Sequence, residues 1–130
     1  MSQENVEVVR DLVDRWNSRD TSDTSYFQPD VEFLPLRAAT EGPYHGIAGI
    51  ERFLADTEQT FETFQVHPAE MLDLGEQVLV WGTGHARMKW SGIEIDFPIG
   101  GVFDFRDGKI ARFEDFGSRG EALKAVGLEE

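Results

Sequence analysis

Asp115 is the residue of this sequence best placed to carry out chemistry. It lies near the end of a segment, residues 98–116, in which Asp107-Gly108 separates two runs rich in Phe, Val and Ile. This pattern predicts a β-hairpin with a three-residue loop, in which Ile99 pairs with Asp115. One face of that hairpin is then apolar apart from one carboxylate, and it comprises Ile99, Gly101, Phe103, Phe105, Ala111, Phe113 and Asp115. A carboxylate among apolar side chains is a candidate general base or a group that orients a ligand.

Two further residues could assist this carboxylate. Tyr44 and His45 stand at the entrance to a predicted helix, where the Tyr44 hydroxyl either points into a pocket or belongs to an ordinary core aromatic. Asp115 has a structural alternative of its own, in which it accepts hydrogen bonds from Trp16, Tyr44 or a helix N-terminus. The three histidines share no spacing typical of metal ligands, and no glycine-rich loop opens a helix. Neither a metal nor another cofactor is therefore expected.

The order of the predicted elements indicates an α+β fold. Apolar residues at helical spacing, followed by strand-like runs, predict helices in the first half and an antiparallel meander in the second. The expected helices cover residues 2–19, 21–27 and 46–61, a strand covers 31–34, a loop covers 35–42, and strands cover 64–72, 77–90, 93–106 and 109–116. A capping box that begins at Ser118 predicts a short closing helix. We expect a curved antiparallel sheet wrapped around the N-terminal helices.

A second turn, at Ser91-Gly92, brings several glycines to the face that holds Asp115. A two-residue turn pairs Arg87 with Asp96, one of two charge pairs expected on the opposite face. Glycines within strands either bend a sheet or leave space for something to approach the backbone. With the aromatic residues around them, they predict a pocket that is lined by Trp16, Phe33, Gly82, Gly84, Met88, Phe97, Ile99, Gly101, Phe103 and Phe113.

The same alternation places Leu79, Trp81 and Val102 on the outer face of the sheet. An exposed Trp with aliphatic neighbours is better explained by a partner surface than by contact with water. We therefore expect a homodimer that forms through the outer face of the sheet.

Composition excludes several classes of partner. The 130 residues are enough for one domain, expected to span 1–130, and 25 acidic against 12 basic side chains leave a formal net charge of −13. This balance argues against nucleic acid and anionic membranes, because both require clustered Lys and Arg. There is no Cys, no apolar run of membrane-spanning length and no pattern of a signal peptide, so a cytoplasmic location is expected.

Three segments, YHGIAGIERFL, VFDFRDGKIARFEDF and EALKAVGL, together resemble the SnoaL-like branch of the nuclear transport factor 2-like superfamily. The resemblance extends from Val6 to Leu128 and implies a cone-shaped α+β fold with an internal pocket. Relatives include isomerases, dehydratases, polyketide cyclases, epoxide hydrolases and non-catalytic binding domains. The resemblance therefore implies a fold without choosing among activities.

The resemblance carries one candidate catalytic residue over to this chain. Positions that match the catalytic Tyr and two Asp of the superfamily's steroid isomerases hold Leu12, Phe33 and Gly101. In limonene epoxide hydrolases, the last catalytic Asp matches Asp115, whereas the positions of their Arg and first Asp hold glycines.

Three classes of function follow from these observations. The first is binding of a small, largely apolar ligand that is neutral or cationic, because the net charge repels an anion and no inward Arg or Lys is predicted. The second is an enzyme of the isomerase, cyclase or hydrolase kind with Asp115 as general base, assisted by Tyr44 or His45. The third is a structural or partner-binding domain with a vestigial pocket.

Overall fold

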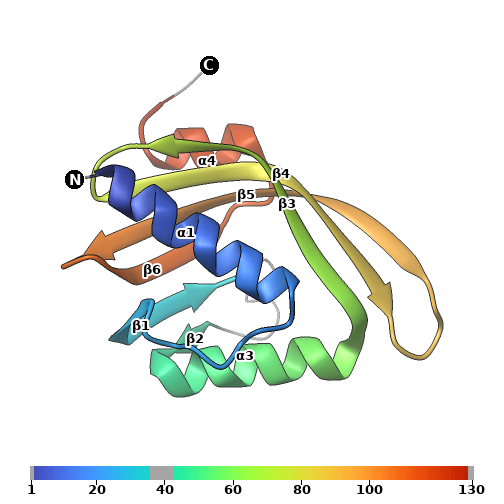
Figure 1. Cartoon of the computed structure of the whole chain (residues 1–130). Coiled ribbons are helices and arrows are strands. Elements are labelled where there is room, and N and C mark those ends of the chain that lie inside the picture. Colours follow the sequence, from blue (N-terminus) through green and yellow to red (C-terminus); the bar gives the residue numbers. More distant parts are fainter. Residues whose placement is uncertain (1, 36–42, 129–130) are drawn as a thin grey trace.

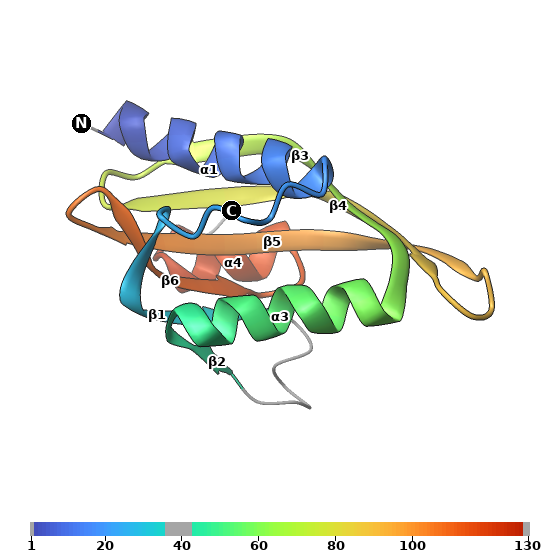
Figure 2. The ribbon, with the colours of Figure 1, turned by 60° about the horizontal axis from the view of Figure 1, so that its bottom comes forward.

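The computed structural model describes residues 2–35 and 43–128, which form three helices around a six-stranded sheet (Figure 1). The helices are α1 (Ser2–Asn17), α3 (Gly46–Thr60) and α4 (Arg119–Ala125). The strands are β1 (Phe27–Leu34), β2 (Tyr44–His45), β3 (Phe61–Asp73), β4 (Gln77–Met88), β5 (Glu94–Arg106) and β6 (Lys109–Asp115). Their order in the sheet is β2-β1-β6-β5-β4-β3. Figure 2 shows the sheet curving around α1 and α3.

The α+β class and the antiparallel meander from β3 to β6 are confirmed. The sheet as a whole is mixed, because β1 runs parallel to β6 and pairs Phe33 with Phe113. The predicted helix over 21–27 is wrong: this stretch is irregular up to the start of β1. There the Asp23 carboxylate accepts hydrogen bonds from the Ser25 amide and hydroxyl, at 2.9 and 2.6 Å, and such local bonds compete with helix formation. Most of the predicted loop, residues 36–42, lies outside the described residues.

The turn between β5 and β6 is tighter than the sequence analysis predicts. Asp107 and Gly108 both adopt positive φ, 53° and 77°, and they form a two-residue turn that pairs Arg106 with Lys109. The register then shifts by one residue at Ala111, so Asp115 pairs with Gly101 and not with Ile99. The predicted three-residue loop is wrong, yet Asp115 keeps the predicted face.

The connection between β4 and β5 is longer than the predicted two-residue turn. Residues 89–93 form the loop, and Arg87 pairs with Glu94 across the sheet while His85 pairs with Asp96. The expected Arg87–Asp96 contact is absent: the Asp96 carboxylate lies 2.6 Å from His85 Nδ1. Each partner has moved by two residues, and a shift of two preserves the face of every side chain. The predicted inner face of these two strands is therefore confirmed.

Apolar side chains pack on both faces of the sheet. The inner core joins α1 and α3 to the strands, with Val9, Val31 and Ile50 fully buried. On the outer face, Leu79 and Val102 are also buried, because Ala122 and Leu123 of α4 cover them. Their predicted exposure is wrong, since the short closing helix needs a surface on which to bury its own apolar side. Trp81, beside them, is half-buried with the Arg119 guanidinium 4.7 Å from its ring.

Candidate functional site

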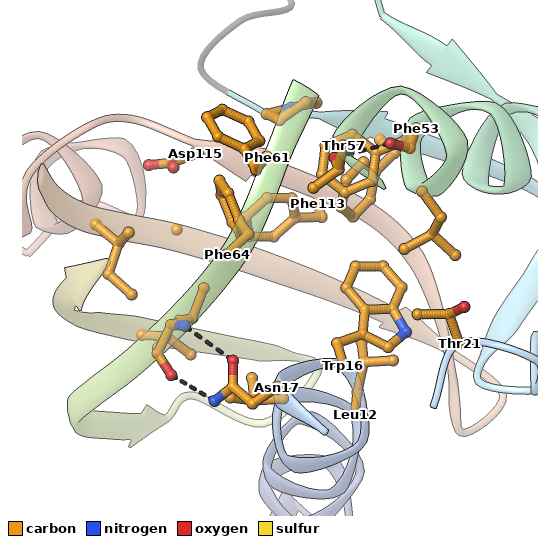
Figure 3. A pocket seen from close by; sticks show the side chains of 18 of the residues that line it. Leu12, Trp16, Asn17, Thr21, Phe53, Thr57, Phe61, Phe64, Phe113 and Asp115 are labelled. Carbon is orange, nitrogen blue, oxygen red and sulfur yellow. Dashed lines mark hydrogen bonds between the residues drawn. The ribbon is translucent and has the colours of Figure 1, made fainter. Parts of the chain in front are cut away.

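A cavity of about 260 Å³ lies between the two inner helices and the concave face of the sheet (Figure 3). Its wall is formed largely by aromatic and aliphatic side chains from α1, α3 and five strands. Of the residues predicted to surround a pocket, the structure brings the following to this wall: Trp16, Phe33, Phe97, Ile99, Gly101, Phe103, Phe113 and Asp115. Helices and sheet thus enclose a largely apolar space whose wall carries the half-buried Asp115 carboxylate, and the exposed Glu58 also lines it.

The glycines do not form the open floor that the sequence suggests. A Cβ atom at Gly84 would lie 2.3 Å from the Phe97 ring, and one at Gly101 would lie 2.5 Å from the Phe113 ring. Gly82 is crowded by backbone, since its Cβ would meet the His67 carbonyl oxygen at 2.2 Å. Gly82, Gly84 and Met88 are absent from the cavity wall. The space beside Gly84 and Gly101 therefore holds rings of this chain.

The two carboxylate oxygen atoms of Asp115 differ in their hydrogen bonds. Its Oδ1 accepts a hydrogen bond from the Gly117 amide at 2.8 Å and a longer one from the Gly100 amide at 3.4 Å. Within residues 2–35 and 43–128, no group donates to Oδ2. Burial raises the pKa of Asp115, and the two backbone donors partly oppose that rise. One oxygen is thus held by the backbone while the other is available to a ligand or a proton.

Neither predicted helper of Asp115 reaches the cavity. Tyr44 is almost fully buried, and its hydroxyl donates to the Asp56 carboxylate of α3 at 3.2 Å. Its ring packs edge-on against Phe53, which is the core alternative considered above. His45 is exposed and lies outside the wall. β2 pairs with the far side of β1, away from β6, and this separates both residues from Asp115.

The rim of the cavity includes residues that the sequence analysis did not identify. The rings of Phe61 and Phe64 lie 5.1 Å apart at the start of β3, and the Phe64 ring lies 5.6 Å from the Phe97 ring. Arg19 and Glu58, both exposed, add opposite charges to the rim. The sequence pattern places Phe61 in the preceding helix, whose apolar periodicity it continues, and it contains no signal that places Arg19 at the cavity.

Asn17 fixes the end of α1 against the sheet. Its side-chain amide donates to the Val66 carbonyl at 2.7 Å and accepts from the Val66 amide at 2.9 Å, which Figure 3 shows as a pair of dashed lines. Asn17 can reach both backbone groups of Val66 because β3 is an edge strand, whose outer side pairs with no other strand. This pair of bonds closes one side of the cavity and holds Trp16, the preceding residue, on its wall.

The described part of the chain has neither a metal-binding cluster nor a membrane-spanning helix. It contains no group of three or more His, Asp or Glu side chains arranged to hold a metal ion. None of its helices is both long and apolar enough to cross a membrane.

The sequence profile of the SnoaL-like domain matches residues 9–113. Among solved structures, TerC co-crystallized with polyporic acid is 26% identical, with a TM-score of 0.78 over 89% of this chain and 92% of that one. A putative SnoaL-like polyketide cyclase from Jannaschia sp. CCS1 is 21% identical, with a TM-score of 0.73 over 95% and 89%. A protein of ketosteroid isomerase-like fold from Catenulispora acidiphila, in complex with trimethylamine, is 18% identical, with a TM-score of 0.74 over 94% and 93%.

A comparison with curated protein sequences finds no match. The profile match nevertheless covers most of the chain, including α3 and nearly the whole sheet. The chain therefore belongs to the family of proteins with a SnoaL-like domain.

Proposed function

We propose that this protein binds a small, largely apolar molecule, neutral or cationic, in the cavity, and that Asp115 orients it. The observation that carries this proposal is the difference between the two oxygen atoms of the Asp115 carboxylate. Oδ1 is held by two backbone amides, so the side chain is fixed, whereas Oδ2 has no donor among the described residues. A fixed acceptor on an apolar wall is the arrangement by which binding sites select the orientation of a ligand.

The charges around the cavity support the choice of ligand. Asp115 is the acidic group on the inner wall, and the exposed Arg19 and Glu58 offset each other at the rim. An anion would therefore meet a carboxylate inside a molecule whose net charge is −13. The neighbours crystallised with polyporic acid and with trimethylamine bind small molecules on the same fold.

Calorimetry with two matched probes tests this function. We expect 2-naphthol, which is neutral and has one hydroxyl donor, to bind more tightly than the anion 2-naphthoate. Asp115→Asn should narrow that difference, because it removes the charge that repels the anion. Asp107→Asn is the control, since it removes a carboxylate from the exposed turn of the same hairpin, where Asn tolerates the positive φ. Equal affinities of the wild-type protein for both probes would contradict the proposal, and binding of neither would favour a vestigial pocket.

The second candidate function is proton transfer with Asp115 as general base. Its specific support is the raised pKa of Asp115 together with the unoccupied Oδ2, since a base is most effective when its pKa approaches the working pH. Exchange of the α-protons of 2-tetralone in D₂O, followed by NMR, tests this without knowledge of the substrate. In that reaction Oδ2 takes a proton from carbon, the resulting enolate is transient, and a deuteron returns. The same exchange rate with Asp115→Asn as with the wild-type protein would exclude this role.

Two expectations about the setting of the protein remain predictions. A homodimer loses Leu79 and Val102 as contact residues, because α4 covers them, so it would use the more polar part of the outer face near His85 and Asp96. Sedimentation at micromolar concentration tests the dimer. Cell fractionation tests the cytoplasmic location.

A further inference from the structure

Trp16 carries a hydrogen-bond donor that has no partner in the described part of the chain. Its ring is half-buried on the cavity wall and packs against Phe27, Phe33 and Phe53, with ring centroids 6.0 to 6.1 Å away. The indole N–H finds no acceptor in residues 2–35 and 43–128. An indole nitrogen in an apolar setting usually has a partner, because an unpaired buried donor costs about 1–3 kcal/mol.

The other polar groups of the inner wall are already paired. The Asn17 amide uses both of its ends on Val66, and the Thr57 hydroxyl donates to the Phe53 carbonyl at 2.8 Å. Apart from the exposed Glu58 carboxylate, the polar side-chain groups on the wall that have no hydrogen bond to the described residues are the Trp16 N–H, the Thr21 hydroxyl and Asp115 Oδ2. Figure 3 shows Trp16 and Thr21 at one end of the cavity and Asp115 at the other, with aromatic rings between them. The cavity is thus apolar in its middle and has a polar anchor at each end.

We propose that Trp16 is a specificity-determining residue whose indole N–H donates to a hydrogen-bond acceptor on the ligand. This inference rests on the proposed function, in which Asp115 holds the opposite end of the same molecule. The ligand class is then an aromatic compound with a donor at one end, for Asp115, and an acceptor such as a carbonyl at the other, for Trp16. The Thr21 hydroxyl lies at the Trp16 end and can donate to the same acceptor.

The size of the cavity limits this class to one or two rings. An engineered cavity of about 150 Å³ in another protein binds benzene, and ordinary ligand pockets begin at about 300 Å³. The volume of about 260 Å³ falls between these values. The walls are suited to flat rings, because Phe33, Phe113 and Phe103 form a continuous cluster of tilted rings with centroids 4.5 to 5.0 Å apart.

Matched naphthalenes test the inference. The probes are 6-hydroxy-2-acetylnaphthalene, which has both polar ends, and 6-ethyl-2-naphthol, which keeps the donor and the approximate shape but lacks the acceptor. Trp16→Phe removes the N–H and keeps an aromatic wall, and it should weaken binding of the ketone about two- to tenfold, the value of one neutral hydrogen bond. It should leave the ethyl compound nearly unchanged. Trp81→Phe is the control, because it makes the same chemical change on the outer face, away from the cavity.

A second measurement does not depend on the variant's folding. In ¹H–¹⁵N spectra of the wild-type protein, the ketone should shift the Trp16 indole N–H resonance downfield, and the ethyl compound should not. Equal affinities of the wild-type protein for the two probes, or the same loss for both on Trp16→Phe, would overturn the role of Trp16 while leaving the pocket intact. If neither probe binds the wild-type protein, the proposed function fails and this inference fails with it.

Discussion

Gly101→Ala tests how tightly the aromatic rings fill the space that the glycines leave. A Cβ atom at Gly101 would lie 2.5 Å from Phe113 Cε1, whereas ordinary contacts begin at 3.4 Å, so the ring must move by about 1 Å. Phe103 and Phe33 stand against the ring at 4.5 and 5.0 Å, which leaves the cavity as the open direction. Overpacking of this kind costs about 1–3 kcal/mol, and the reduced freedom of the unfolded chain returns about 0.4–1 kcal/mol. The expected net loss of stability is about 1–2 kcal/mol.

Urea unfolding at 25 °C measures this loss directly. The midpoint should fall by about 0.5–1 M with an unchanged slope, since the slope for a small domain is about 1–3 kcal/mol/M. Binding of 2-naphthol should weaken as well, because the displaced ring occupies cavity volume. Gly120→Ala is the matched control: it lies in α4, has no atom within 4 Å of its Cβ position and should be neutral or slightly stabilising. Wild-type stability together with wild-type affinity in Gly101→Ala would refute the packing described here.

Three further perturbations test other parts of the structure. Because burial raises the pKa of Asp115, the folded state binds the proton of this carboxyl group more tightly than the unfolded chain does. The contribution of Asp115 to stability is therefore full at pH values below its pKa in the unfolded chain. It is lost as the pH rises through its pKa in the folded state. Urea unfolding at stepped pH should show this decline, and Asp115→Asn should remove it; an opposite slope would mean that the backbone donors dominate. Asn17→Ala should lower the free energy of unfolding by about 1–3 kcal/mol and speed hydrogen exchange at the Val66 amide. An unchanged exchange rate would contradict the two hydrogen bonds between Asn17 and Val66. Leu79→Ala should cost about 2–5 kcal/mol in the same unfolding assay, because α4 covers a fully buried side chain, whereas a loss near zero would restore the exposed outer face.

The face of each residue in the last three strands is predictable from the sequence, because side chains alternate between the two faces along a strand. Both predicted hairpin registers are wrong, but each is wrong by two residues on β5. Asp115 pairs with Gly101 in place of Ile99, and Arg87 pairs with Glu94 in place of Asp96. A displacement of two returns every side chain to its original face, so Asp115 and Phe113 stayed on the inner side. At the β5–β6 turn itself the difference is one residue, and the register shift at Ala111 adds the second; without that shift, the pairing at Asp115 would differ by an odd number and the predicted faces would not match.

The sequence does not reveal which segment of the chain covers each apolar surface. Leu79 and Val102 alternate correctly onto the outer face, but the pattern does not reveal that α4 returns to cover them. The glycines likewise indicate space but not what fills it, and the rings of Phe97 and Phe113 occupy that space. Tyr44 is a candidate from its sequence position, but its strand β2 pairs with the side of β1 that faces away from β6. These outcomes depend on contacts between segments far apart in the chain.

The register shift at Ala111 also explains why, among the described residues, the donors to Asp115 reach one and the same oxygen. It sets Asp115 opposite Gly101, at the end of β6, where the chain turns through Gly117 with φ 82°. That left-handed conformation, which glycine adopts without strain, directs the Gly117 amide back to Oδ1. The other donor, the Gly100 amide, comes from the neighbouring strand and reaches the same oxygen. Because both donors approach along the backbone, the second oxygen is left to the cavity, and the turn that ends the sheet thereby determines which atom of Asp115 can meet a ligand.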